Sequence, residues 1–264
     1  MEPVEIINGT SPVVLGFPHT GTYLPEETYS RLTPLGQALG DTDWHIHRLY
    51  SGLLENATSV RATFHRYVID ANRDPSGKSL YPGKNTTGLV PIIDFDGEPL
   101  WLDPPTEAEI AANLADYHAV YHEALERELK RIRDIHGVVI LYDCHSIRSN
   151  IPYLFDGTLP DFNIGTNDGY TCMPEVQHKV ERICEQAEHY TTVTNGRFKG
   201  GWTTRHYGRP AEGFHAIQME LAQSTYLETE EPPFGYDDGK AENLRIHLKQ
   251  MLRSLEAVAL SQEQ

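Results

Sequence analysis

The sequence predicts an α/β protein built as a three-layer αβα sandwich around a mostly parallel mixed sheet. The first observation is the run Val138–Tyr142, which is apolar throughout and is therefore typical of a strand buried on both faces. The second is the amphipathic helical pattern of residues 106–136, which leads directly into that strand. The third is the alternation of helical and strand patterns, which is typical of proteins whose helices cover both faces of a sheet.

The N-terminal part of the chain predicts strands separated by one helix and one long loop. Residues 12–17 form a short apolar run that Pro18 ends, and they predict the first strand. Residues 35–55 carry an apolar face at helical spacing and predict a helix. Residues 59–70 predict one or two strands. Residues 76–105 are rich in Gly, Pro, Asn and Asp and predict an irregular loop, which at this length is usually functional.

The C-terminal part begins with the long helix, for which Thr106 and Glu109 have the spacing of a capping box. After the central strand we expect a helix over residues 174–189, opened by Pro174, and then a loop rich in Gly and Arg over residues 196–213. A strand over residues 214–222 and a last helix over residues 239–259 follow. No repeat or linker interrupts the pattern, so we expect residues 1–264 to form a single domain.

Composition narrows the classes of partner. The chain has 22 basic and 38 acidic residues and a formal charge of −16, which argues against non-specific binding to nucleic acid or to an anionic membrane. No apolar stretch approaches the roughly 20 residues of a membrane span, and no signal-peptide pattern opens the chain. Three widely spaced cysteines predict reduced thiols. We expect a cytoplasmic protein that acts on a small molecule, and its composition leaves homo-oligomerisation open.

Side chains that can bind a metal ion follow the predicted strands. His19 follows the first strand, His145 follows the central one, and Glu220 lies near the end of the last one. Ligands of open α/β sheets bind at the carboxyl ends of strands, and catalytic zinc sites take three ligands from His, Asp or Glu. The ligand candidates are therefore His19, Asp41 or Asp43, and His145, with Glu220 as general base. The residues alone do not decide between the two aspartates, and helix capping is an ordinary role for either.

Six short motifs occur in an order that resembles one known family. They are Pro18-His19-Thr20-Gly21, Asp41-Thr42-Asp43-Trp44, Asp70-Ala71-Asn72-Arg73-Asp74, Asp143-Cys144-His145-Ser146, Tyr207-Gly208-Arg209-Pro210 and His215-Ala216-Ile217-Gln218-Met219-Glu220. Together they resemble the N-formylglutamate amidohydrolase (N-formylglutamate deformylase) family, and the matching blocks run from about residue 12 to residue 226. The arrangement is more distantly similar to zinc carboxypeptidases and aspartoacylase-type deacylases.

The resemblance implies a zinc-carboxypeptidase-like fold and a metal-dependent hydrolase. The implied reaction is hydrolysis of N-formyl-L-glutamate to formate and L-glutamate, the last step of a histidine-degradation route. His19, Asp43 and His145 match the ligands of one divalent ion, and the expected ion is Zn²⁺. As the acidic ligand, Asp43 matches the family better than Asp41. Glu220 matches the general base. The carboxypeptidase motif has its acid three residues after the first histidine, where this chain has Thr22, so the acidic ligand must come from a later loop.

Further residues are implied for the substrate. The pair Asn72-Arg73 matches the residues that bind the substrate carboxylate in that family, and the planar guanidinium of arginine can bind a carboxylate through two hydrogen bonds. A dicarboxylate needs a second cation, for which Arg205, Arg209 and Arg148 are candidates and Arg205 is preferred. His215 or Arg148 is the expected donor to the oxyanion.

Three alternatives stay open at this point. One is a deacylase of another N-acyl dicarboxylic amino acid, and another is a non-catalytic module that binds amino-acid anions. The third is a cysteine or serine hydrolase that uses Cys144 or Ser146. Adjacent residues of a strand point to opposite faces, which argues against a working pair of Cys144 and His145, and no Gly-x-Ser-x-Gly elbow surrounds Ser146.

Overall fold

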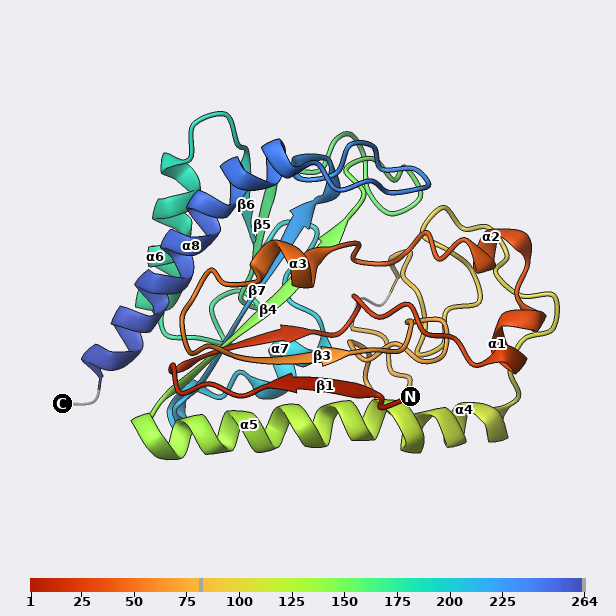
Figure 1. Ribbon diagram of the computed structural model, residues 1–264, viewed down its shortest axis with the longest axis horizontal. Coiled ribbons are helices and arrows are strands. Elements are labelled where there is room, and N and C mark those ends of the chain that lie inside the picture. Colours follow the sequence, from red (N-terminus) through yellow and green to blue (C-terminus); the bar gives the residue numbers. More distant parts are fainter. Residues whose placement is uncertain (81–82, 263–264) are drawn as a thin grey trace.

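The computed structural model describes residues 1–80 and 83–262, and within these ranges seven strands form one mixed sheet (Figure 1). The order across the sheet is β1-β3-β2-β4-β7-β5-β6. The strands are β1 (Val4–Ile7), β2 (Val13–Phe17), β3 (Thr58–Ala62), β4 (Val139–Ile147), β5 (Phe162–Gly165), β6 (Thr192–Thr194) and β7 (Phe214–Ala222). The four central strands β3, β2, β4 and β7 are parallel, whereas β1 and β5 join them antiparallel. β6 is parallel to β5.

Helices cover both faces of this sheet (Figure 1). They are α1 (Glu26–Arg31), α2 (Pro34–Gln37), α3 (Ile46–Tyr50), α4 (Glu107–Asn113), α5 (Val120–His136), α6 (Pro174–Gln186), α7 (Trp202–Tyr207) and α8 (Asp238–Ser261). α5 and α7 pack on one face, and α3, α6 and α8 pack on the other. None of the helices within the described ranges combines the length and the apolar character needed to cross a bilayer.

The central strand β4 is buried on both faces, as its sequence predicts. Val139 and Leu141 contribute to the core beneath α5, whereas Ile140, Tyr142 and Cys144 contribute to the core beneath α8. Side chains alternate along a strand, so Asp143 and His145 point to the same face as Val139 and Leu141. The predicted fold class, a three-layer sandwich with a mostly parallel mixed sheet, is confirmed. The expectation of a single domain stays a prediction.

The helix predicted over residues 35–55 is wrong as one element. The chain forms α2 and then α3, and the turn between them has positive φ at Leu39 (55°) and at His45 (57°). Such left-handed positions end a helix. The turn carries Asp41 and Asp43 into the interior, where both are buried.

Three other segments differ in part from the prediction. Of residues 59–70 only residues 59–62 belong to a strand, β3. The irregular segment that follows contains the buried polar residues His65, Arg66 and Asp70. The long helix of residues 106–136 forms, but a π-helical turn, Leu114–Ala119, separates α4 from α5. The predicted loop of residues 196–213 contains α7. The loop predicted over residues 76–105 is irregular where it is described, and residues 81–82 lie outside the described ranges.

Candidate metal centre and active site

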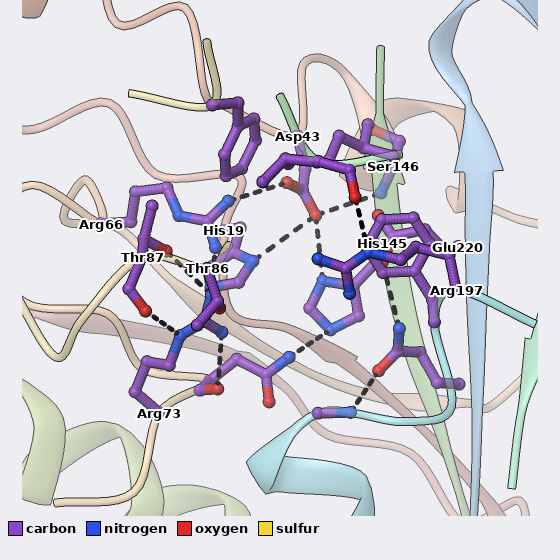
Figure 2. Close-up of a pocket in the computed structure, with 17 residues that line it drawn as sticks. His19, Asp43, Arg66, Arg73, Thr86, Thr87, His145, Ser146, Arg197 and Glu220 are labelled. Carbon is purple, nitrogen blue, oxygen red and sulfur yellow. Dashed lines mark hydrogen bonds and ion pairs between the residues drawn. The ribbon is translucent and has the colours of Figure 1, made fainter. Parts of the chain in front are cut away.

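Four of the residues predicted to act together meet at the carboxyl ends of the parallel strands (Figure 2). His19 follows β2 after one proline, and Asp43 lies in the turn before α3. His145 and Glu220 lie on the neighbouring strands β4 and β7, directly opposite each other in the register. These four residues line one cleft, which lies where parallel α/β sheets bind their ligands.

Two histidines and one aspartate form a buried group that can hold a metal ion. The Nδ1 atom of His145 lies 3.1 Å from Oδ2 of Asp43, and Nδ1 of His19 lies 3.8 Å from the same oxygen. One ligand atom from each residue lies within 4.8 Å of the other two. The three residues are 1–3% exposed. Two imidazoles and one carboxylate are the donor set of many catalytic zinc sites.

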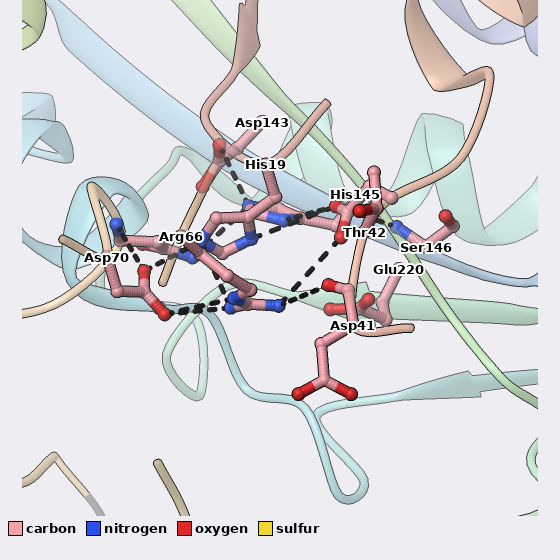
Figure 3. Close-up of polar contacts among 12 residues, drawn as sticks. His19, Asp41, Thr42, Arg66, Asp70, Asp143, His145, Ser146 and Glu220 are labelled. Carbon is pink, nitrogen blue, oxygen red and sulfur yellow. Dashed lines mark hydrogen bonds and ion pairs between the residues drawn. The ribbon is translucent and has the colours of Figure 1, made fainter. Parts of the chain in front are cut away.

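Asp41 is not part of this group. Its carboxylate accepts a hydrogen bond from the backbone N–H of Phe95 and points away from the two histidines (Figure 3). Burial raises the pKa of Asp41 to about 7. The geometry therefore favours Asp43 over Asp41 as the acidic member of the group.

A second carboxylate lies behind each histidine. The Nε2 atom of His19 is 2.7 Å from Oδ1 of Asp70, and Nε2 of His145 is 3.1 Å from Oδ1 of Asp143. An imidazole that donates from Nε2 has its lone pair on Nδ1, and in both rings Nδ1 is the atom that faces Asp43. Such carboxylate–histidine pairs are usual at metal sites, where they fix the tautomer and the direction of the ring. The donor set therefore fits a divalent metal ion.

Each outer carboxylate accepts a hydrogen bond through its second oxygen, and Figure 3 shows Arg66 beside Asp70. Arg66 donates to Oδ2 of Asp70 at 2.8 Å, and the hydroxyl of Thr204 donates to Oδ2 of Asp143 at 2.8 Å. Burial would raise the pKa of Asp70, but Arg66 and Arg73 hold it well below its usual range. Asp70 is therefore a fixed acceptor for the N–H of His19.

The electrostatics of the cleft favour a cation. Burial lowers the pKa of His145, but Asp143 and Asp43 outweigh it and raise that pKa well above its usual value. Burial also raises the pKa of Glu220 to about 8, and the Asp43 carboxylate adds to this effect. Buried carboxylates that raise the pKa of their neighbours attract positive charge, and a divalent ion supplies that charge.

The sequence reasoning assigned no role to Asp70 and Asp143, although a signal for each was available. Asp143 precedes His145 by two residues on one strand, so the two side chains share a face. Asp70 precedes the Asn72-Arg73 pair and stands in the same motif.

Asn72 and Arg73 both line the cleft. The Oδ1 atom of Asn72 accepts from the backbone N–H of Thr203 at 2.9 Å, so its Nδ2 faces His145, 3.2 Å from Nε2. Arg73 donates to the carbonyl and the hydroxyl of Thr87 and to the carbonyl of Asn72. Its Nη1 also lies 3.8 Å from Oδ2 of Asp70, so the guanidinium is held at the cleft wall by the chain around it.

The other predicted polar residues lie outside the cleft-lining set. Arg205 donates to the carbonyl of Gly200, Arg209 pairs with Glu212, and Arg148 pairs with Asp96. His215 lies on the opposite face of β7 from Glu220. There its Nδ1 accepts from the backbone N–H of Met173, and burial lowers its pKa to about 4. The structure therefore does not bring Arg148, Arg205, Arg209 or His215 together with the metal-binding group.

The cleft contains instead an arginine that the sequence reasoning did not single out. Arg197 lines it, donating to the carbonyls of Leu154 and Asn85 (Figure 2). Its guanidinium thus bridges two loops that border the cleft. Phe95 and Phe198 contribute apolar walls. About 600 Å³ of atom-free space, which includes the open mouth of the cleft, lies among these residues.

The geometry does not support the nucleophile alternatives. Cys144 is fully buried in the core beneath α8, on the face away from His145, and burial raises the pKa of its thiol well above the usual value. Ser146 borders the cleft, where its hydroxyl accepts hydrogen bonds from Tyr226 and Gln223 rather than lying against a base.

Comparison with known proteins identifies the relatives of the chain. The model of a family described as N-formylglutamate amidohydrolase matches residues 11–227. The chain is 44% identical over 257 residues to the N-formylglutamate deformylase of Pseudomonas aeruginosa, covering 96% of both chains. It is 45% identical over 250 residues to the enzyme of that name from Pseudomonas putida, covering 94% of this chain and 93% of the other.

Two solved structures share the fold. The N-formylglutamate amidohydrolase of Ralstonia eutropha JMP134 superposes with a TM-score of 0.77 at 26% identity, over 100% of this chain and 97% of that one. A protein of Agrobacterium tumefaciens superposes with a TM-score of 0.71 at 18% identity, over 99% of this chain and 96% of the other, and shows the fold alone.

Proposed function

The chain belongs to the N-formylglutamate amidohydrolase family, and from this premise we propose that it hydrolyses N-formyl-L-glutamate to formate and L-glutamate. The observation that carries the proposal is the position of Glu220 beside the buried His19–Asp43–His145 group, in a cleft that arginines line. We further propose that the reaction takes place in the cytoplasm as the last step of a histidine-degradation route. Whether chains associate stays open.

The metal ion of the proposal is Zn²⁺, held by His19, Asp43 and His145. A divalent ion bound there supplies a Lewis acid for the formyl carbonyl and lowers the pKa of water. Asp70 and Asp143 keep the two imidazoles in the tautomer whose Nδ1 faces the ion.

The substrate is a dicarboxylate, and two arginines of the cleft suit its two carboxylates. Arg73 and the amide of Asn72 would hold the α-carboxylate, because both line the cleft and the planar guanidinium suits a carboxylate. Arg197, which also lines the cleft, would hold the side-chain carboxylate in place of Arg205 or Arg209. Two fixed cations favour a dicarboxylate over a substrate with one carboxylate, because only the dicarboxylate brings a negative group to each arginine.

Glu220 is the general base of the proposed mechanism. It removes a proton from the water that attacks the formyl carbon, and a C–O bond forms as the carbonyl electrons move to oxygen. Glu220 then returns the proton to the amide nitrogen, and the electrons on the oxygen re-form the C=O bond as the C–N bond breaks. L-glutamate leaves with a free amine, and the formic acid formed loses a proton to give formate. Arg66, a buried cation that lines the cleft, would stabilise the negative charge on the formyl oxygen.

Formate release tests the proposal. The purified chain, stripped with a chelator and reloaded with Zn²⁺, should release formate from N-formyl-L-glutamate, and the stripped chain should not. N-formyl-L-alanine tests the need for a second carboxylate, and N-acetyl- and N-succinyl-L-glutamate test the acyl preference. Faster turnover of an N-acetyl or N-succinyl compound would replace the formyl substrate with another N-acyl dicarboxylic amino acid. Binding of N-formyl-L-glutamate without turnover under any metal would make the chain an anion-binding module.

A further inference from the structure

Gln218 is a buried polar residue of the cleft to which the proposed mechanism gives no role. It is 3% exposed, lies on β7 two residues before Glu220 and lines the same cleft. Residues two apart on a strand share a face, so Gln218 and Glu220 point to the same side of the sheet. In the register of the sheet they lie opposite Asp143 and His145. Gln218 is therefore the neighbour of the general base on its own strand.

The orientation of the Gln218 amide is fixed by the start of α7. The backbone N–H of Gly201 donates to Oε1 of Gln218 at 2.7 Å, which makes this atom the carbonyl oxygen. Its Nε2 must then face the other way, where it donates to Oε2 of Glu220 at 3.0 Å. In the reversed orientation the amide NH₂ would face the N–H of Gly201, and the amide oxygen would face the carboxylate of Glu220. Neither contact could be a hydrogen bond. One backbone N–H thus sets the direction of a hydrogen bond onto the catalytic carboxylate.

The chain approaches Gln218 closely because the turn before α7 has glycines. Gly200 has φ of +104°, which side chains other than glycine rarely adopt. A Cβ atom on Gly201 would lie 2.2 Å from Nδ2 of Asn72. The absence of a side chain on Gly201 therefore lets it lie against Asn72 while its N–H donates to Gln218.

We propose that Gln218 is a positioning residue that holds Oε2 of Glu220 and leaves Oε1 to take the proton from the attacking water. This inference rests on the proposed function. A carboxylate with one oxygen pinned by a charge-assisted hydrogen bond loses rotamer freedom, so the base is in place before substrate binds. Gln218 acts through Glu220, and we expect its loss to lower kcat and leave substrate affinity unchanged.

The chain offers a matched control. Gln177 of α6 accepts from the hydroxyl of Thr166 at 2.7 Å and donates to Oε1 of Glu181 at 2.9 Å, so it also joins a donor to a carboxylate. It does not belong to the cleft-lining set. Gln177→Met and Gln218→Met each remove one accepted hydrogen bond and one hydrogen bond donated to a glutamate, the first outside the cleft and the second within it.

The experiment compares the zinc-loaded wild type, Gln218→Met and Gln177→Met. In Gln218→Met we expect kcat for N-formyl-L-glutamate to fall about 10- to 100-fold, KM to stay within about twofold, and zinc content to be unchanged. Gln177→Met should match the wild type. Should Gln218→Met fail to fold, Gln218→Glu keeps the acceptor for Gly201 and puts a second carboxyl group against Glu220. The two would share a proton, which takes the base away, so kcat should fall at least as far.

Crystal structures of the two methionine variants give a readout besides activity. The Glu220 carboxylate should be displaced in Gln218→Met and unmoved in Gln177→Met. The proposal is overturned by an unchanged kcat, by a loss that appears in KM or in zinc content, or by an unmoved Glu220. A wild-type chain that releases no formate refutes the proposed function instead, and the position of Glu220 still decides the role of Gln218.

Discussion

Replacing Asp143 with asparagine tests whether the carboxylate behind His145 serves the metal. The variant keeps the size of the side chain, and its amide oxygen can take the place of Oδ1, 3.1 Å from Nε2 of His145. Its NH₂ group would face Thr204, whose hydroxyl can turn from donor to acceptor. The packing is therefore kept and the negative charge is lost.

The size of the effect follows from these contacts. Outer partners of metal-binding histidines contribute about 10- to 100-fold to metal affinity. A neutral hydrogen bond is roughly half as strong as a charge-assisted one, so Asp143→Asn should raise the Kd for zinc about tenfold. Asp143→Ala loses the hydrogen bond altogether and should approach 100-fold.

The pH dependence of this effect has a definite sign. Asp143 and Asp43 raise the pKa of His145 in the metal-free chain, so protons compete with zinc for this ring. Asp143→Asn lowers that pKa and weakens the competition, which hides part of the lost affinity at low pH. The ratio of the two Kd values should therefore widen as the pH rises.

The assay is a titration of the stripped chain with Zn²⁺ against a chromophoric chelator at several pH values. Asp161→Asn is the matched control, because Asp161 also accepts from a threonine hydroxyl, that of Thr191, and does not line the cleft. Its Kd should equal that of the wild type. An Asp143→Asn Kd that equals the wild-type value at every pH would refute the role of this carboxylate.

Four further predictions concern the cleft. Glu220→Gln should keep bound zinc while kcat falls about 10²- to 10⁴-fold, which metal analysis and formate release together measure; near-normal turnover would remove Glu220 as base. Arg73→Ala should raise KM at least about tenfold, and an unchanged KM would exclude Arg73 from the substrate site. Arg197→Ala should raise KM for N-formyl-L-glutamate to a similar extent, whereas Arg205→Ala should not; equal KM values for these two variants would argue against Arg197. Alkylation with iodoacetamide under native conditions should leave the rate of formate release unchanged, since Cys144 is fully buried; inactivation that follows modification of Cys144 would contradict this.

The elements with strong periodicity could be predicted from the sequence. β4 and the helical pattern that becomes α4 and α5 are long and bury wide apolar surfaces, so their patterns are clear. The break between α2 and α3 could not be predicted in this way, because residues of both helices have apolar side chains at helical spacing. It lies between positive φ angles at Leu39 and His45, and the signal that could have placed it is the Gly40-Asp41 pair between them, since glycine and aspartate favour turns.

The metal-binding group could be predicted in part because its members follow strands. His19 and His145 stand at strand ends in the sequence, and strand ends meet in space. The arginines could not be sorted in this way. Arg197 and Arg205 lie within one Gly-rich segment, and whether a long side chain reaches the cleft depends on the start of α7, where Arg205 turns back to Gly200.

Strand parity carries further information about the site. His215 precedes Glu220 by five residues, an odd number, so the two must point to opposite faces of β7, and the structure has them so. Gln218 precedes Glu220 by two residues and shares its face. Counting positions along a predicted strand would have excluded His215 from the cleft and included Gln218.

Because side chains alternate along β7, the packing of the core and the position of the proposed base both depend on the register in which β7 pairs with β4. On β7, Phe214 and Ala216 belong to the core beneath α5, whereas Ile217 and Met219 belong to the core beneath α8. A shift of β7 by one residue would exchange the two faces and move Glu220 from the cleft into the apolar core beneath α8. A carboxylate there would have no partner, so hydrophobic burial and the cost of a buried charge both oppose the shift. The apolar alternation that predicts the strand therefore also holds the general base opposite His145.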